Sequence, residues 1–270
     1  PSPPLRQAAR PPHVHPALTG DTMGGVRCLY VDLDGTLLGP GGVLLRDGDG
    51  AFSLLPARAL EACARAGVEV VVVTGRRRDG LREVIRLLGV ESYVFEIGGG
   101  LVLDGEVQWL GGEGAFARIA ESGAPALLRE HFGLEPHAPW DAGREVSHLL
   151  RGDADPAEAN ALLARHGHDD LRLLDNGHGV HHLVPAGISK AAAVAAHMRA
   201  RGYEAADCIA VGDSGEDVAM AEHVGAFWLV ANAEPRAVDA ARGVPNVRRA
   251  EDGHGAGVYE AVVTTLAERR

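Results

Sequence analysis

The 270-residue sequence contains one lysine, Lys190, among 26 Lys and Arg residues. Aromatic residues make up only 4% of the chain, so aliphatic side chains must fill its core. The net charge of -11 argues against nucleic acid or an anionic membrane as the main partner, because both select basic surfaces. No apolar run approaches the roughly 20 residues that a membrane helix needs. A small anionic substrate stays open, because local charge decides its binding.

Cysteine is also rare, with Cys28, Cys63 and Cys208 and no C-x-x-C pair. Two of the three stand in apolar, strand-like runs, which predicts buried, reduced thiols and a cytoplasmic location. The first 22 residues are rich in Pro, His and Arg and lack the apolar centre of a secretory signal. We expect residues 1–22 to be a disordered leader before Met23, which is a candidate natural start.

Strand-like and helix-like segments alternate in two parts of the chain, residues 23–98 and 185–270. The strands are apolar on both faces, as in "VEVVVVTGR" and "DCIAVGDS". This pattern predicts an α/β fold with a Rossmann-like core, in which helices cover both faces of a parallel sheet. In the helix "SKAAAVAAHMRARG", Ser189 is the predicted N-cap and Gly202 the predicted stop.

Residues 99–184 have a mixed pattern. "LVLDGEVQWL" predicts a hairpin around Asp104 and Gly105, and "LRLLDNGHGVHHLVP" predicts a second hairpin. Amphipathic stretches at 114–132 and 155–167 predict helices. We therefore expect an α+β domain inserted into the parallel core.

Three predicted core strands end in a polar residue: Asp32, Thr74 and Asp213. In an open parallel sheet, the carboxyl ends of the strands share one edge, and ligands bind where the strand order reverses. Asp34 follows Asp32 by two residues, which places both carboxylates on the same side of an extended backbone. The sequence therefore predicts a site at this edge.

The chemistry of this site follows from its charges. Two carboxylates held close favour a cation or a shared proton, and Mg²⁺ suits carboxylate and carbonyl oxygens. Asp217, four residues after Asp213, adds a carboxylate, and Lys190 adds a balancing positive charge. This set is typical of phosphoryl transfer, in which an aspartate attacks phosphorus while a second carboxyl group moves the protons.

"DLDGT", "VVVTGR", the lone lysine and "GDSGEDVAM" stand in the order of the four motifs of the haloacid dehalogenase-like superfamily. The chain resembles this family over about residues 26–98 and 185–264. The insertion between the second and third motifs resembles the α/β cap of the Cof-type sugar phosphatases. The resemblance implies that this cap closes over the site and selects the substrate.

The resemblance also implies a metal site. Asp32 would be the nucleophile and a Mg²⁺ ligand. Asp34 would be the general acid and base, with its backbone carbonyl on the metal. Asp213 would bind Mg²⁺ directly or through water, and Asp217 would support that shell.

A phosphate site is implied in the same way. Thr74 and the Gly75 amide would hold the phosphoryl group, and Lys190 would pair with Asp32 and the phosphate. Arg76, directly after Thr-Gly, is a candidate to face the substrate. Glu216 departs from the family pattern, which has Asn there. Because an ionised Glu accepts hydrogen bonds and would repel phosphate, it points away, or it meets the metal shell or an arginine.

The insertion offers basic side chains for the rest of the substrate. They are Arg144, His148, Arg151, His178, His181 and His182. Solvated surface is the alternative that the sequence slightly favours for each of them. No cysteine or metal motif accompanies the histidines, which disfavours a zinc site.

Ile97 in "FEIGGG" is a second departure from the family pattern, after Glu216, because the family often has an "ENGA"-like turn there.

The predicted function is a Mg²⁺-dependent phosphatase that acts through an aspartyl-phosphate. Its substrate would be a small phosphorylated metabolite, such as a sugar phosphate or a glycosyl-phosphoglycerate. A phosphomutase with the same nucleophile is one alternative. A degenerate protein that binds phosphometabolites without turnover is another, and Glu216 is its only support. No motif identifies the substrate, and both a monomer and a homodimer fit the sequence.

Overall fold

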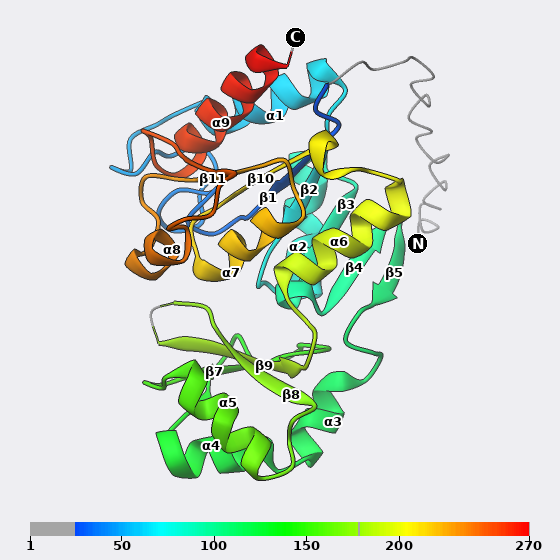
Figure 1. Cartoon of the computed structure of the whole chain (residues 1–270), viewed down its shortest axis with the longest axis vertical. Helices are drawn as coiled ribbons and strands as arrows, with labels where there is room; N and C mark the ends of the chain where they lie inside the picture. The colour runs from blue at the N-terminus through cyan, green and yellow to red at the C-terminus, as the bar shows by residue number, and fades with distance from the viewer. Residues whose placement is uncertain (1–24, 178, 270) are drawn as a thin grey trace, which may run out of the picture.

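The computed structural model describes residues 25–177 and 179–269. The predicted leader at residues 1–22 and the candidate His178 lie outside these residues. Figure 1 shows a larger core in the upper half of the view and a smaller part below it, which we call the cap. Within the described residues, no helix is long and apolar enough to cross a membrane.

An eight-stranded sheet forms the centre of the core, in the order β12-β11-β10-β1-β2-β3-β4-β5. Its strands are β1 (Cys28–Val31), β2 (Glu69–Val73), β3 (Ser92–Phe95), β4 (Gly100–Leu103), β5 (Glu106–Trp109), β10 (Cys208–Gly212), β11 (Ala226–Leu229) and β12 (Val247–Arg249). The strands from β12 to β3 are parallel, β4 pairs antiparallel with β3, and β5 pairs antiparallel with β4. The predicted α/β fold is therefore confirmed.

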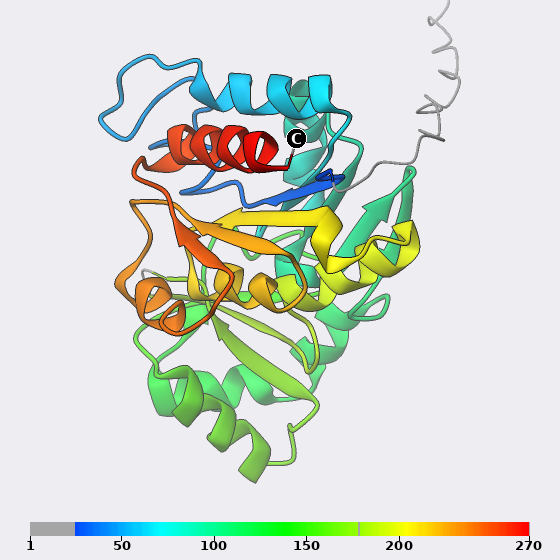
Figure 2. The ribbon, with the colours of Figure 1, turned by 45° about the horizontal axis from the view of Figure 1, so that its top comes forward.

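Helices cover both faces of this sheet, as Figure 2 shows. On one face lie α1 (Leu55–Ala66), α2 (Arg78–Leu88) and α9 (His254–Glu268); on the other lie α6 (Lys190–Arg201), α7 (Gly215–Val218) and α8 (Pro235–Ala240). Short 3-10 turns lie at η1 (Glu96–Gly98), η2 (Ala205–Asp207) and η3 (Ala219–Glu222). Central strands such as β1 and β10 are fully buried, which explains their continuous apolar runs.

The boundaries of α6 place the lone lysine. The Ser189 hydroxyl accepts a hydrogen bond from the Ala192 amide, as an N-cap does. At the other end Gly202 takes the left-handed conformation that ends a helix. Both predicted boundaries are confirmed. Lys190 is thus the first residue of the helix and is held at a fixed point of the core.

The cap has its own antiparallel sheet, in the order β6-β7-β9-β8. Its strands are β6 (Glu135–Pro136), β7 (His148–Arg151), β8 (Leu171–Asp175) and β9 (Val180–Pro185), and its helices are α3 (Ala115–Glu121), α4 (Ala124–Phe132) and α5 (Pro156–Arg165). Aliphatic residues such as Leu128, Leu163 and Leu183 form a separate apolar cluster between this sheet and its helices. The inserted α+β domain is therefore present.

The first predicted hairpin belongs to the core and not to the insertion. β4 and β5 form a hairpin around Asp104 and Gly105, as expected, but β4 also pairs with β3 and extends the large sheet. Leu101 in β4 is fully buried, because it belongs to the apolar cluster between the large sheet and α6. The expected start of the insertion at residue 99 is thus too early. The pairing partner of a hairpin depends on long-range packing, which its local pattern does not contain.

The strand order reverses at β1. From β1 the chain continues through β2 to β5 on one side, and β10 to β12 lie on the other side. The carboxyl ends of β1 and β10 are therefore neighbours at a topological switch point, which is where open α/β sheets bind ligands. Asp32 directly follows β1, and Asp213 directly follows β10.

Candidate active site

Asp32 and Lys190 form a buried pair at the switch point. The Lys190 ammonium donates to Asp32 Oδ1 and to Asp217 Oδ1, each at 2.7 Å. Only 4% of either Asp32 or Lys190 is exposed to solvent. The ammonium thus holds one oxygen of Asp32, and the other oxygen has no hydrogen-bond partner among the described residues.

Burial and neighbouring charges set the protonation of this pair. Burial raises the pKa of Asp32 well above its ordinary value, although the positive charge of Lys190 opposes the shift. Burial alone would lower the pKa of Lys190, but the negative charges of Asp217 and Asp32 outweigh it and raise that pKa. Lys190 therefore stays positively charged between the two carboxylates.

Asp213 and Asp217 complete a carboxylate cluster beside Asp32. The Thr36 hydroxyl donates to Asp213 Oδ1 at 2.8 Å, and the Ser214 hydroxyl donates to Asp217 Oδ2 at 2.7 Å. Burial, together with the charge of Asp217, raises the pKa of Asp213 to about 7. Because both oxygens of Asp217 already accept protein hydrogen bonds, Asp217 supports the cluster from behind.

The cluster fits a divalent cation. One carboxylate oxygen from each of Asp32, Asp213 and Asp217 lies within 4.8 Å of the others. Hard oxygen donors of this kind suit Mg²⁺. One oxygen each of Asp32 and Asp213 has no protein donor among the described residues, which leaves these two groups able to bind a cation.

Gly35 allows the close approach of the two strand ends. A Cβ atom at this position would lie only 2.3 Å from Asp213 Oδ2, and its φ of +85° also favours glycine. The Asn232 side chain donates to the Gly35 carbonyl at 2.8 Å and fixes the turn from outside. The glycine of "DLDGT" is therefore required by space as well as by backbone conformation.

Asp34 and Arg76 form an ion pair at the core side of the site. Arg76 Nε donates to Asp34 Oδ2 at 2.7 Å, and a second nitrogen of the guanidinium donates to Asp34 Oδ1. Nearby, the Arg76 amide donates to the Thr74 hydroxyl at 3.2 Å. The Gly75 amide has no partner among the described residues, so it is free to bind a ligand.

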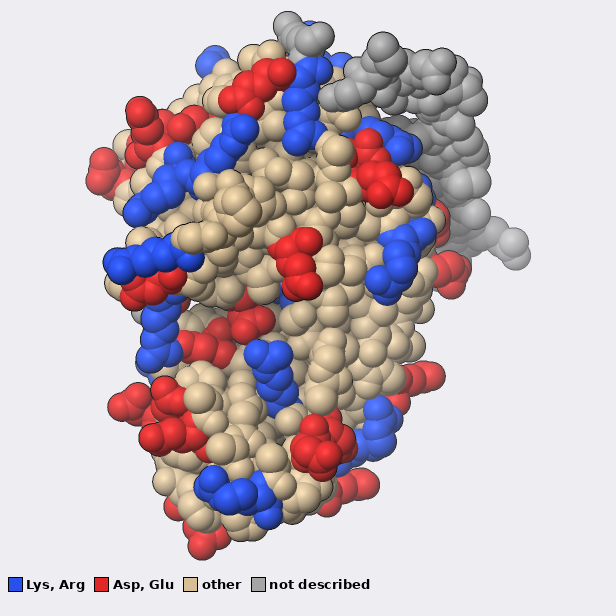
Figure 3. Space-filling model, viewed as in Figure 1, with Lys and Arg blue, Asp and Glu red and all other residues tan. Residues whose placement is uncertain are grey.

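A cleft of about 690 Å³ lies between the core and the cap over this site. Eight of the nine core residues predicted to act on phosphate or metal line it: Asp32, Asp34, Thr74, Gly75, Arg76, Lys190, Asp213 and Asp217. Figure 3 shows a hollow between the two parts, with acidic side chains in it. The structure thus brings the core motifs together at one edge of the sheet.

The cap candidates divide into two groups. Arg144 and His182 line the cleft. His148 does not line it; its ring stacks on Phe116 and its Nε2 lies 3.1 Å from the Phe116 carbonyl oxygen. Arg151 is exposed and also lies outside the cleft lining.

Two further candidates lie elsewhere. Glu216 does not line the cleft, and burial raises its pKa while the charge of Arg172 in the cap opposes the shift. Glu216 is thus not among the residues that line the cleft, and the charge of Arg172 acts on it, as expected if it meets an arginine. His181 faces a second, smaller hollow with Asp175 and Arg236.

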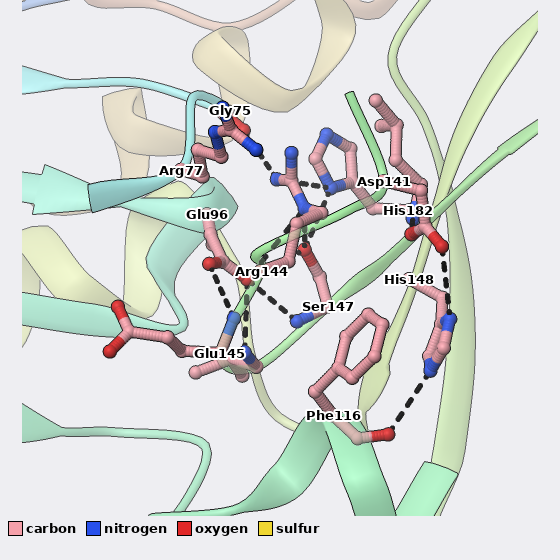
Figure 4. A network of polar contacts seen from close by, with 12 residues as sticks. Gly75, Arg77, Glu96, Phe116, Asp141, Arg144, Glu145, Ser147, His148 and His182 are labelled. Carbon is pink, nitrogen blue, oxygen red and sulfur yellow. Dashed lines mark hydrogen bonds and ion pairs between the residues drawn. The ribbon is translucent and has the colours of Figure 1, made fainter. Parts of the chain in front are cut away.

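Glu96 is a polar residue that the sequence analysis missed. It is completely buried, and its carboxylate accepts hydrogen bonds from the amides of residues 145, 146 and 147 in the cap at 2.8, 3.0 and 2.8 Å. Arg144 lies 3.7 Å from the same carboxylate and donates to the Gly75 carbonyl at 2.6 Å. Figure 4 shows this network between core and cap. Glu96 directly follows β3, so the rule of polar strand ends would have found it.

The cleft also has cap residues that no motif indicated. Trp140, which is 58% exposed, and His137 lie against each other with their ring centroids 4.8 Å apart. Asn176 reaches toward Gly75 from the turn between β8 and β9. Ile97 takes a left-handed conformation with φ of 58°, so the turn that departs from the family sequence still has an unusual backbone.

Comparisons with known proteins agree with this geometry. The model of the haloacid dehalogenase-like hydrolase family matches residues 29–110 and 144–254. A phosphoglycolate phosphatase of Methanoculleus marisnigri is 28% identical over 240 residues, which cover 88% of this chain and 95% of that protein. A phosphoglycolate phosphatase of Halorubrum lacusprofundi is 30% identical over 221 residues, which cover 79% and 88%.

Solved structures share the fold. The sucrose-phosphatase from Synechocystis, solved with sucrose and phosphate, has a TM-score of 0.71 and 18% identity, and the match covers 89% of this chain and 98% of that chain. A phosphatase from Bacteroides thetaiotaomicron has a TM-score of 0.68 and 18% identity, with 93% and 98% covered. The similarity therefore includes both the core and the cap.

Proposed function

The chain belongs to the haloacid dehalogenase-like hydrolase family and is a phosphatase, and we propose that it hydrolyses the monoester of a small phosphorylated metabolite. One observation carries this proposal most directly. Asp32 is buried at the switch point with one oxygen held by Lys190 at 2.7 Å and the other directed to no protein donor among the described residues. This is the arrangement that a carboxylate nucleophile needs.

The proposed reaction has two displacements on phosphorus. In the first, the free oxygen of Asp32 attacks and the bond from phosphorus to the ester oxygen breaks. The Asp34 carboxyl group, which must be protonated and released from its ion pair with Arg76 for this step, gives its proton to the leaving oxygen. In the second, Asp34 takes a proton from water, the water oxygen attacks phosphorus, and the bond to Asp32 breaks. Inorganic phosphate and the free Asp32 carboxylate result.

One positive group and two neutral hydrogen-bond donors of the protein would hold the phosphoryl group during both steps. Lys190 lies against the nucleophile, and the free Gly75 amide and the Thr74 hydroxyl lie beside it in the cleft. Asp32 and Asp213, supported by Asp217, would hold Mg²⁺. When bound, the ion supplies positive charge that offsets the charge on the phosphoryl oxygens.

The identity of the substrate is the finer part of the proposal. The cleft is large enough for a small metabolite and is closed on one side by the cap. The names of the similar curated proteins make phosphoglycolate the first compound to test. Sugar phosphates and glycosyl-phosphoglycerates, the substrates expected from the sequence motifs, are the next.

The test is release of inorganic phosphate from p-nitrophenyl phosphate and from these esters with Mg²⁺ present. We expect Asp32→Asn to lose activity by at least about a thousandfold, because an amide does not replace the carboxylate nucleophile. Asp79→Asn, in the first turn of α2, is the matched control and should keep wild-type rates. Near-wild-type turnover in Asp32→Asn would contradict the mechanism. Transfer of the phosphoryl group to a second hydroxyl, without free phosphate, would indicate a mutase instead.

A further inference from the structure

His182 lies at the point where the cap meets the phosphate loop. It stands in β9 between Leu149 of β7 and Leu174 of β8, and 1% of it is exposed to solvent. It lines the cleft that also contains Asp32. A Cβ atom on Gly75 would lie 3.1 Å from His182 Nε2, so this nitrogen faces the loop whose amide is free to bind a ligand.

The other ring nitrogen faces Arg144 and Ser147. Nδ1 lies 3.4 Å from a guanidinium nitrogen of Arg144 and 3.2 Å from the Ser147 hydroxyl. An arginine can only donate, so the Arg144 contact favours an Nδ1 that accepts and a neutral ring with its proton on Nε2. Nε2 itself has no hydrogen-bond partner among the described residues.

The surroundings keep the ring neutral. Burial, and then the charges of Arg144, Lys190 and His181, hold the pKa of His182 well below its ordinary value. The Ser147 hydroxyl accepts from Arg144 Nε at 3.0 Å and donates to the Glu96 carboxylate at 3.1 Å. Glu96 therefore orients Ser147 and Arg144, and these two residues orient His182 (Figure 4).

The charges on the cap side of the cleft indicate what accepts this hydrogen bond. The cap residues that line the cleft include Arg144, His137 and His182 but no Asp or Glu. Arg77, at the start of α2, also reaches the cap and donates to the Ala142 carbonyl. An anionic oxygen is therefore favoured on this side of the cleft.

We propose that His182 is a specificity-determining residue whose Nε2–H donates to a carboxylate oxygen of a short phosphorylated acid. This inference rests on the proposed function and names the substrate class for the same cleft. Arg144 and Glu96 are positioning residues, because they act on the substrate through the orientation and tautomer of His182. Simple phosphate esters without a carboxylate would lose this contact.

The test compares phosphoglycolate with ethyl phosphate, which has the same chain length but no carboxylate. We expect the ratio of their kcat/KM values to favour phosphoglycolate in the wild type and to fall roughly ten- to hundredfold in His182→Leu. The loss should be mainly in KM, because the contact lies outside the reacting bonds. His182→Gln, whose amide N–H can replace Nε2–H, should lose less of the ratio. His148→Gln, in the same cap but outside the cleft, should keep it.

Measurement of the tautomer gives an independent readout. We expect the nitrogen NMR shifts of His182 to show a bare Nδ1 and a protonated Nε2, and Arg144→Met to disturb this state and lower the substrate ratio. A protonated Nδ1 in the wild type, a wild-type ratio near one, or a His182→Leu ratio within about threefold of the wild type would overturn the inference. In each of these cases hydrolysis of ethyl phosphate would leave the proposed function standing. If the wild type hydrolyses neither ester, the proposed function fails instead.

Discussion

Lys190 illustrates how much the site depends on one side chain. Its ammonium fits between Asp32 and Asp217, with 2.7 Å to an oxygen of each, in a space that is almost closed to solvent. A guanidinium is larger, planar and suited to a two-pronged contact with one carboxylate. The single lysine of the chain thus stands where arginine would serve poorly.

We therefore expect Lys190→Arg to lower kcat by roughly a hundredfold or more, although it conserves charge. Arg199→Lys, on the exposed side of the same helix, is the control and should leave kcat unchanged. Steady-state rates with p-nitrophenyl phosphate measure both. Normal turnover in Lys190→Arg would mean that the lysine is not part of the phosphate site.

At the scale of elements, the turn after β3 links the core to the cap. The Glu96 carboxylate accepts three cap amides and a hydroxyl in a completely buried position. In Glu96→Gln, the amide group would turn a donor toward those donors. We expect a loss of about 1–3 kcal/mol in the free energy of unfolding, because buried polar groups lose their partners.

Glu145 offers a matched control for this prediction. It also joins cap to core, through Arg78, but both side chains are about one-third exposed. Glu145→Gln should cost less than about 1 kcal/mol, as expected for a partly solvated ion pair. Chemical denaturation measures both variants. Equal losses in the two would show that the buried carboxylate does not hold the junction.

Elements and site differ in how far the sequence predicts them. Strand ends such as Asp32, Thr74 and Asp213 could be predicted, because parallel strands bring their carboxyl ends to one edge whatever the details of packing. The boundaries of α6 could also be predicted, since caps act locally. The pairing of β4 with β3 and the orientation of the His182 ring could not be predicted, because both depend on residues that are distant in the chain.

For the whole molecule, the buried carboxylates link stability to pH. Burial raises the pKa of Asp213 from 3.8 to about 7 in the folded, metal-free chain. The folded state then binds more protons than the unfolded state between these values, so stability falls as pH rises from about 4 to 7. A bound cation competes with these protons.

We therefore expect Mg²⁺ to raise the Tm more at pH 8 than at pH 6, compared with the protein in EDTA. Asp213→Asn should remove most of this difference, because the variant has no proton to lose there. Thermal unfolding at the two pH values measures both. A shift that is independent of pH would contradict a metal site that contains Asp213.

Formation of a covalent phosphoryl group on Asp32 tests the central claim most directly. In Asp34→Asn the leaving group of p-nitrophenyl phosphate needs no acid, but the water of the second step has lost its base. Rapid mixing should therefore give a burst of about one nitrophenol per site, and acid quenching followed by peptide mapping should place the phosphoryl group on Asp32. Turnover without such a burst, or a label on any other residue, would contradict the account.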